Sequence, residues 1–156
     1  MRRLTILALA AAPGLVIAAP LLADDAAYRG WPVYGGPDHI QYSALRQIDT
    51  GNVAQLSVAW TFDTGDAFGE GGNASEMQCN PIIVDGVMYV VSPKLRVFAL
   101  DAATGRQIWV FDPNGDQPVL SKQRLRGVSY WSDGTEARIF MTARSFLIAI
   151  DARTGK

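Results

Sequence analysis

The sequence predicts an all-β protein built from a repeated four-stranded unit, and three observations lead to this fold class. The apolar residues after position 23 show no helical periodicity and occur in short runs separated by Gly, Asp, Asn and Pro. Two of these runs flank an Asp-Gly pair, a sequence that suits a tight hairpin. A strand-and-turn segment then recurs 50 positions later. A repeat of this length made of strands indicates a β-propeller or a related array.

The first repeat unit is expected to contain four short antiparallel strands. The strands are expected at residues 82–84, 87–91, 95–100 and 107–111. Asp85 and Gly86 form the hairpin between the first two strands, because both turn positions need a positive φ. Four such strands within about 30 residues correspond to one propeller blade.

The turn between the third and fourth strands carries the repeat. Residues 99–106 (ALDAATGR) are matched by residues 149–156 (AIDARTGK), and the upstream strand 87–92 is matched by 138–143. The aspartate can accept hydrogen bonds from amides two or three residues on, the threonine can cap the same loop, and the glycine supplies a left-handed conformation. The alternative is two unrelated hairpins that share a common turn, and the matched flanking strands argue against it.

Trp109 follows the first repeated turn and is expected to pack flat between adjoining blades. Its counterpart in the second unit would stand at position 159, beyond Lys156. The sequence therefore predicts about the first two blades of a propeller, with the second blade lacking its outer strand. Because a repeat unit cannot bury its faces alone, we interpret the chain as a piece of a longer protein or as a broken reading frame.

The first 23 residues have the layout of a secretory signal peptide. A basic start (Met1–Arg3) precedes an apolar run, and Ala23 offers a small residue before Asp24. A retained membrane anchor is the alternative, although two prolines and a glycine argue against a spanning helix of about 20 residues. We expect cleavage near Ala23, a periplasmic location and a mature propeller portion of residues 24–156.

Charge and cysteine content exclude further classes. Removal of residues 1–23 takes away two of the 14 basic residues and none of the 15 acidic ones, which leaves a formal charge of −3. No basic stripe with interleaved aromatic residues occurs, so no nucleic-acid partner is expected. Cys79 is the only cysteine, which excludes an internal disulfide and a lipid-anchored cysteine at the cleavage site.

Five segments occur in an order that resembles one known family. They are 31–36 (WPVYGG), 41–45 (QYSAL), 52–66 (NVAQLSVAWTFDTGD), 99–109 with its Asp, Thr-Gly and Trp, and 126–131 (RGVSYW). Together they resemble the quinoprotein dehydrogenases, which depend on pyrroloquinoline quinone (PQQ). The similarity runs from about Tyr28 to Lys156, and the order of the motifs is more specific than any one of them.

The resemblance implies an eight-bladed quinoprotein propeller in full-length relatives and a periplasmic oxidoreductase. Such enzymes use PQQ with a bound divalent cation, usually Ca²⁺, to oxidise an alcohol or sugar hydroxyl to a carbonyl. A catalytic aspartate removes the hydroxyl proton while hydride passes to the quinone, and electrons leave to a quinone or cytochrome acceptor that the sequence does not identify. The aspartate and the metal ligands are expected in later blades. No catalytic or metal-ligating residue is therefore assigned here, and this portion alone is not expected to turn over.

Three residues are candidates for contact with PQQ, a flat ortho-quinone that carries three carboxylates. Arg126 lies in the Arg-Gly segment that contacts the cofactor in the family, and a guanidinium can grip a carboxylate through two hydrogen bonds. The alternative is a surface arginine in a cation-rich loop with Lys122 and Arg124. Gln78 stands where alcohol-oxidising members often carry a cofactor-contacting glutamate, and the alternative is an ordinary loop residue. Thr142 aligns with a cofactor-contacting threonine, although strand threonines are common.

One departure from the family pattern concerns the substrate. Methanol and ethanol dehydrogenases carry adjacent cysteines shortly before the Arg-Gly segment, whereas this chain has Leu120 and Ser121 there. By analogy, the difference favours the glucose-dehydrogenase-like branch of the family, whose members oxidise sugars or polyols. Two other interpretations stay open. A non-enzymatic propeller scaffold of the outer-membrane assembly type would share the turns without needing Arg126 or the Gln78 loop, and a truncated product would be inactive.

Overall fold

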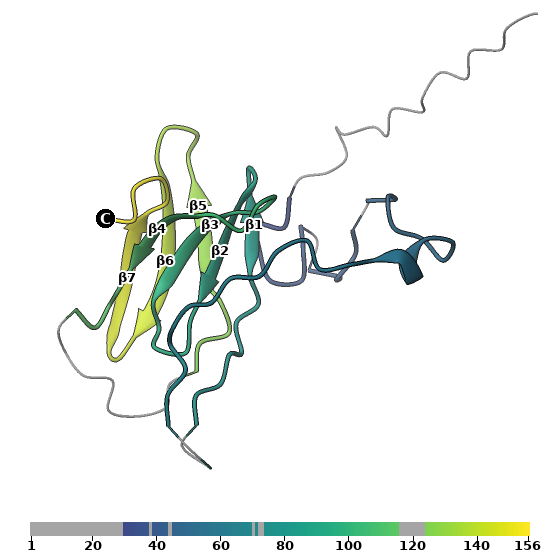
Figure 1. Ribbon diagram of the computed structural model, residues 1–156. Helices are drawn as coiled ribbons and strands as arrows, with labels where there is room; N and C mark the ends of the chain where they lie inside the picture. The colour runs from purple at the N-terminus through teal and green to yellow at the C-terminus, as the bar shows by residue number, and fades with distance from the viewer. Residues whose placement is uncertain (1–29, 38, 44, 70, 72–73, 116–123) are drawn as a thin grey trace, which may run out of the picture.

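The computed structural model describes residues 30–156 except 38, 44, 70, 72–73 and 116–123, and it contains two antiparallel sheets (Figure 1). The first sheet has the order β1 (Ile82–Val84), β2 (Val87–Val91), β3 (Val97–Asp101) and β4 (Gln107–Phe111). The second has the order β5 (Ser129–Ser132), β6 (Ala137–Ala143) and β7 (Phe146–Asp151), and a short 3-10 turn, η2, spans Val53–Gln55. The expected signal peptide at residues 1–23 lies outside the described residues, as do Leu120 and Ser121. Within the described part of the chain, no helix has the length and apolar character needed to cross a bilayer.

The first sheet confirms the predicted four-stranded unit, with one change at its third strand. Asp85 and Gly86 have φ values of 49° and 77°, as the expected hairpin requires. The third strand begins at Val97, not at Leu95, because Leu95 has a φ of 64°. Its amide donates to the Ser92 carbonyl at 2.9 Å within a tight loop. Leu95 is nevertheless buried, so its apolar character serves the packing of a loop and not of a strand.

The second sheet repeats the pairing of the first. In the first sheet Val87 pairs with Asp101, and in the second Arg138 pairs with Asp151. In both sheets, a residue near the start of the second strand pairs with the aspartate that begins the repeated turn. The match between residues 87–92 and 138–143 is therefore confirmed in three dimensions, and the two sheets are equivalent blades.

The two Asp-x-x-Thr-Gly turns have the same hydrogen bonds. In the first turn Asp101 Oδ1 accepts from the Ala103 amide at 3.0 Å, from the Thr104 amide at 2.9 Å and from the Thr104 hydroxyl at 2.9 Å. In the second turn Asp151 Oδ1 accepts from the Arg153 amide at 3.0 Å, from the Thr154 amide at 2.8 Å and from the Thr154 hydroxyl at 2.9 Å. The hydrogen bonds, led by that from the Thr104 hydroxyl, hold the pKa of Asp101 below its usual range.

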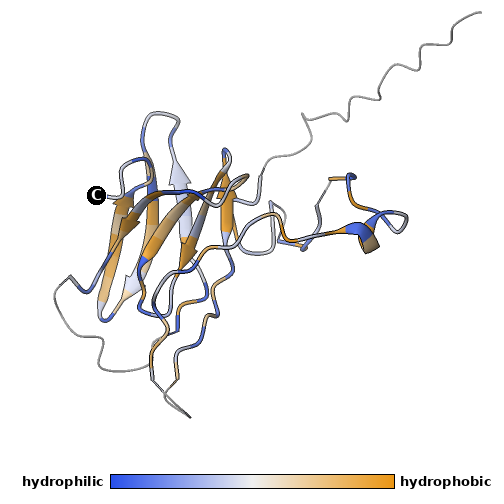
Figure 2. Ribbon diagram, viewed as in Figure 1, coloured by the Kyte–Doolittle hydropathy of each residue, from blue (hydrophilic) through white to orange (hydrophobic). Residues whose placement is uncertain are grey.

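The core lies between the two sheets, and Figure 2 shows that apolar residues concentrate in the strands. Trp109 of β4 packs against the second repeated turn, where a Cβ on Gly155 would lie 2.8 Å from its ring. Its indole Nε1 donates to the Ala152 carbonyl at 3.0 Å. Tyr89 donates to the same carbonyl at 3.2 Å and lies 5.8 Å from the Trp109 ring, centroid to centroid. The predicted packing of Trp109 between adjoining blades is confirmed.

The opposite face of the first sheet packs against the segment that precedes it in the chain. Trp60 and Phe62 contact a second buried cluster formed by Val90, Phe98 and Leu100. The rings of Phe62 and Phe98 meet edge to face at 5.2 Å. The first sheet is thus covered on both faces, which leaves its strand ends as the places where function can be built.

Candidate functional site

The three predicted cofactor residues lie at one end of the two sheets. Gln78 precedes β1 and Arg126 precedes β5, and in each sheet the first strand begins beside the end of the second. Thr142 lies near the end of β6 and is exposed. Because Ser129 pairs with Phe140, extension of this antiparallel register by two residues brings Thr142 to the level of the residue after Arg126. All three therefore belong to the same end of the molecule.

The two loops that carry Gln78 and Arg126 are joined through Asn80. The Asn80 amide donates to the Arg126 carbonyl at 2.7 Å, and the Asn80 side chain donates to the same oxygen at 3.3 Å. Gly127 has a φ of 154°, and a Cβ there would lie 2.9 Å from the Asn80 carbonyl oxygen. Only glycine permits this approach, so the Arg-Gly pair keeps the backbone of Arg126 beside the first blade.

The Arg126 side chain lines a pocket and has no partner among the described residues. The pocket has a volume of about 280 Å³ and is lined by Tyr34, Asn80, Arg126, Gly127, Val128 and Ser129. No hydrogen bond or ion pair joins the guanidinium to another side chain in the part of the chain that the structure describes. An exposed guanidinium on an anchored backbone is suited to binding an anion.

A second link between the loops runs through Glu76. Arg124 Nε donates to Glu76 Oε2 at 2.9 Å, and Gln78 Nε2 donates to the same oxygen at 2.7 Å. The hydrogen bond to Glu76 raises the pKa of Arg124 above its usual range. The amide of Gln78 is thereby oriented with its nitrogen towards Glu76, which leaves its carbonyl oxygen as an acceptor. Lys122 of the cation-rich loop lies outside the described residues.

A buried ion pair stiffens the loop between β2 and β3 at the same end. Asp66 is 1% exposed and accepts hydrogen bonds from Arg96, one of them from Nε at 3.0 Å. Lys94 Nζ lies 3.9 Å from the same carboxylate. The Arg96 guanidinium also lies over the Phe98 ring, 5.0 Å from its centroid. These contacts tie residues 64–66 to the first blade, beside the segment that leads to Gln78.

Cys79 lies between Gln78 and Asn80 but serves packing. Its sulfur accepts a hydrogen bond from the Val91 amide at 3.2 Å and contacts both buried clusters. Burial raises the pKa of the Cys79 thiol. The thiol is therefore protonated near neutral pH and is not an activated nucleophile.

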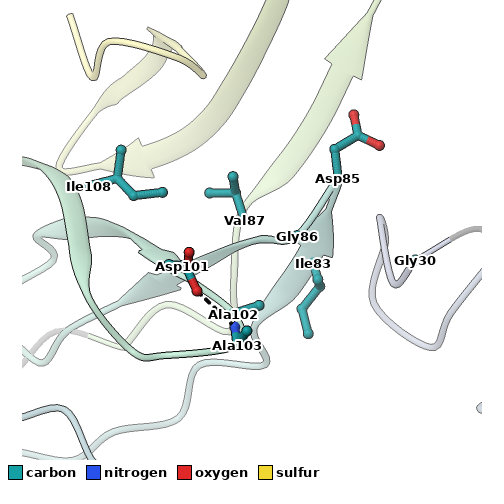
Figure 3. A pocket seen from close by; sticks show the side chains of 9 residues that line it. All are labelled: Gly30, Ile83, Asp85, Gly86, Val87, Asp101, Ala102, Ala103 and Ile108. Atoms are coloured by element: carbon teal, nitrogen blue, oxygen red, sulfur yellow. Dashed lines mark hydrogen bonds between the residues drawn. The ribbon is translucent and has the colours of Figure 1, made fainter.

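A larger pocket at the other end of the sheets has a different character (Figure 3). It has a volume of about 960 Å³ and is lined by Gly30, Ile83, Asp85, Gly86, Val87, Asp101, Ala102, Ala103 and Ile108. Its two carboxylates belong to turns, and Figure 3 shows that of Asp101 bonded to the backbone of Ala103. A lining with two acids and no base does not suit an anionic ligand. Across the described residues, no group of three or more His, Cys, Asp or Glu side chains is arranged to hold a metal ion.

The sequence predicts three residues of this end, and it does not identify two residues that position them. Arg126, Gln78 and Thr142 were predicted from the family resemblance, whereas Glu76 and Asn80 were not singled out. Glu76 and Arg124 have opposite charges, and each lies two positions before a predicted cofactor residue, a signal that could have indicated their ion pair. Asn80 has no such signal, because its role depends on a backbone carbonyl 46 positions away.

Comparison with known proteins bears on the family and the fold of the chain. Residues 31–156 match the family model described as the β-propeller domain of PQQ glucose/ethanol/alcohol dehydrogenases. The dehydrogenase subunit of the alcohol dehydrogenase (quinone) of Gluconobacter oxydans is 37% identical over 139 residues, which cover 85% of this chain and 17% of that protein. The lanthanide-dependent methanol dehydrogenase of Methylorubrum extorquens is 36% identical over 169 residues, covering 100% of this chain and 26% of that protein.

A solved structure shares the fold as well as the sequence. The crystal structure of quinohemoprotein alcohol dehydrogenase from Comamonas testosteroni matches with a TM-score of 0.68 and 33% identity, covering 83% of this chain and 19% of that one. The chain thus spans between about a sixth and a quarter of the length of these relatives. With the sheets, the repeated turns and the family match in agreement, the chain belongs to the family of PQQ-dependent glucose, ethanol and alcohol dehydrogenases, and its two sheets are blades of their β-propeller.

Proposed function

We propose that this chain supplies the first cofactor contacts of a PQQ-dependent dehydrogenase that oxidises the hydroxyl group of a small molecule to a carbonyl. The observation that carries the proposal is the Arg126 guanidinium. It lines a pocket without a side-chain partner among the described residues, while its backbone is held by Asn80 and its neighbour Gly127 packs closely. The charge of Arg124, two positions earlier, is already used by Glu76.

The residues at this end fit a planar ligand with several carboxylates. Arg126 would hold one carboxylate through two charge-assisted hydrogen bonds, which are among the stronger polar contacts in proteins. Gln78 would offer its carbonyl oxygen, and Thr142 its hydroxyl group. When bound, PQQ supplies the redox chemistry by accepting the two electrons of the substrate, and the protein residues bind and orient it. A divalent cation such as Ca²⁺ would be held by ligands elsewhere in the whole protein.

For the substrate we propose an alcohol. The relatives from Gluconobacter, Methylorubrum and Comamonas are an alcohol, a methanol and an alcohol dehydrogenase by name, which favours an alcohol over the sugar expected from the absent cysteine pair. The family model also covers glucose dehydrogenases, so sugars and polyols belong in the assay. The name of the Gluconobacter enzyme includes quinone, and a quinone or a cytochrome is the acceptor class to test.

The test uses the whole protein that contains this chain, loaded with Ca²⁺ and titrated with PQQ. Arg126→Ala should weaken PQQ binding by about 10- to 100-fold, since a charged hydrogen bond contributes about 1.5–3 kcal/mol. Arg126→Lys should weaken it less, because it keeps the charge and loses the paired geometry. The control is Arg138→Ala, which removes an arginine from the opposite end of the second sheet, where it pairs with Glu136. Unchanged affinity in Arg126→Ala would remove this residue from the cofactor site.

Dye reduction against a panel of alcohols, polyols and sugars then tests the activity of the unmodified protein. Turnover that depends on added PQQ and Ca²⁺ supports a dehydrogenase, and the preferred substrate decides between alcohol and sugar. Absence of both PQQ binding and turnover would favour a non-enzymatic scaffold. We also propose export with cleavage near Ala23, which mass determination of the mature N-terminus checks.

A further inference from the structure

The carboxylate of Glu76 is the point at which the side chains of Gln78 and Arg124 meet. Arg124 Nε donates to Glu76 Oε2 at 2.9 Å, and its Nη2 donates to Oε1 at 3.5 Å. Gln78 Nε2 donates to the same Oε2 at 2.7 Å. The guanidinium lies 48 positions further along the chain than the acid. This one carboxylate therefore joins the loop before β1 to the loop before β5.

The hydrogen bond to Glu76 fixes which end of the Gln78 amide is available to a ligand. A side-chain amide has a donating nitrogen and an accepting oxygen, whereas an ionised carboxylate only accepts. The nitrogen of Gln78 must therefore face Glu76, and the carbonyl oxygen is turned away from that carboxylate. Gln78 is exposed, and no described residue donates to this oxygen. Position 78 thus presents a neutral hydrogen-bond acceptor.

The backbone that carries Glu76 is held on both sides. Before it, the Ser75 amide donates to the Phe68 carbonyl at 2.8 Å. After it, the Asn80 amide donates to the Arg126 carbonyl at 2.7 Å. The carboxylate and the amide that it binds therefore lie on an anchored segment. The orientation of the amide is set before a ligand arrives, which lowers the entropic cost of binding.

The same carboxylate distinguishes two nearby arginines. Arg124 is bound by Glu76, whereas Arg126 lines the pocket without a side-chain partner among the described residues. A ligand that reaches both Arg126 and Gln78 therefore meets a guanidinium at one and a neutral acceptor at the other. This combination suits a molecule that has both a carboxylate and an N–H or O–H group. PQQ has such groups in its carboxylates and its ring N–H.

We propose that Glu76 is a positioning residue of the cofactor site, which holds Gln78 so that its carbonyl oxygen accepts a hydrogen bond from an N–H or O–H group of PQQ. Arg126 then binds a carboxylate of the cofactor, and Glu76 itself does not touch it. The inference rests on the proposed function and adds to it the residue that sets the polarity of position 78. An acid at position 78 would not serve, because two like charges would then replace the hydrogen bond of 2.7 Å.

Titration of PQQ into the whole protein with Ca²⁺ tests the inference through three variants. Gln78→Glu replaces the donating nitrogen by a second carboxylate and should weaken PQQ binding by about 10-fold or more. Glu76→Gln combined with Gln78→Glu exchanges the two groups and restores a bond between carboxylate and amide, so most of the affinity should return. Asp112→Asn combined with Gln78→Glu is the matched control. It has the same formal charge, but Asp112 binds the Asn114 amide, so this variant should stay weak.

Two outcomes of this titration would overturn the inference. One is native affinity in Gln78→Glu, and the other is equal recovery in the two double variants, which would make net charge the cause. If Arg126→Ala still weakens binding in that case, the proposed function stands and only the role of Glu76 falls. The melting temperatures of the variants should stay close to that of the unmodified protein, because the Glu76 and Arg124 side chains are 41% and 52% exposed. A loss of affinity is then not a loss of folding.

Proton NMR of the 156-residue chain tests the positioning without PQQ. One of the two side-chain amide protons of Gln78 should resonate downfield of its position in an unstructured glutamine, and Glu76→Ala should remove that shift. Glu136→Ala is the control, because it removes an acid bound to Arg138 at the opposite end of the second sheet, and it should leave the shift in place. Failure of the unmodified whole protein to bind PQQ would overturn the proposed function. An unshifted Gln78 amide would overturn the positioning by Glu76, whether or not PQQ binds.

Discussion

Gly105 should tolerate a side chain much less well than a hairpin glycine of the same conformation. Gly105 has a φ of 72° and Gly86 has a φ of 77°, so alanine at either position meets a similar left-handed cost of about 1–2 kcal/mol. The surroundings differ. A Cβ on Gly105 would lie 2.5 Å from Cε3 of Trp60, whereas nothing lies within 4 Å of a Cβ on Gly86. The difference between the two variants therefore reports the contact with Trp60.

The size of this difference follows from what the Trp60 ring must give up. To admit a methyl group, the ring has to move away from the turn and lose its hydrogen bond to the Ala102 carbonyl, about 1 kcal/mol. It also loses part of its packing, about 1–2 kcal/mol against the 3–5 kcal/mol of a complete Trp→Ala truncation. We expect Gly105→Ala to lower the free energy of unfolding by about 3–5 kcal/mol, and Gly86→Ala by about 1–2 kcal/mol.

Urea unfolding of the chain, followed by circular dichroism and tryptophan fluorescence, measures both values. A second comparison removes the ring first. In a Trp60→Ala background, Gly105→Ala should cost about as much as Gly86→Ala, because the three atoms nearest to the new methyl group all belong to the Trp60 ring. Equal losses for the two glycine variants in the native background would refute the docking argument.

Three further results are expected from buried groups. Burial raises the pKa of Tyr89 from 10.0 to about 12, so Tyr89 ionises at lower pH in the unfolded state than in the folded state. The free energy of unfolding should therefore fall as pH rises from about 10 to 12. An ultraviolet titration in which Tyr89 of the folded protein ionises near pH 10 would contradict this expectation. Because burial raises the pKa of Cys79, a thiol reagent at pH 8 should label it slowly in the folded chain and at once in urea, and fast labelling of the folded chain would count against it. Arg96→Met leaves the Asp66 carboxylate buried without its main partner and should cost about 3 kcal/mol in thermal unfolding, with part recovered by adding Asp66→Asn. No recovery in the double variant would show that the loss does not come from the ion pair.

The local elements were predictable because their causes lie within a few residues. The hairpin at Asp85 and Gly86 and the hydrogen bonds of Asp101 depend on side chains and φ angles inside a single turn. The predicted start of the third strand at Leu95 was wrong because the burial of Leu95 does not depend on its near neighbours in the chain. Leu95 has the apolar character of a strand residue, but its burial comes from a loop packed on the core, which composition does not distinguish from a strand.

The candidate site was predictable in part. The family resemblance pointed to Arg126, Gln78 and Thr142, and the sheet ends bring these three to one end of the molecule, while their contact with PQQ stays a prediction. The use of Glu76 by both Arg124 and Gln78 was not predicted, since it requires two loops to meet across 48 positions of sequence.

By itself the sequence determined the blades, because each strand and each Asp-x-x-Thr-Gly turn is stabilised by residues that are near neighbours in the chain. Only the tertiary structure decided which tryptophan docks on which turn and which arginine keeps its guanidinium available. Trp60 meets the Ala102 carbonyl 42 positions away, and Asn80 meets the Arg126 carbonyl 46 positions away. Contacts of that separation form when segments distant in the chain pack against each other, and no local pattern of residues specifies them.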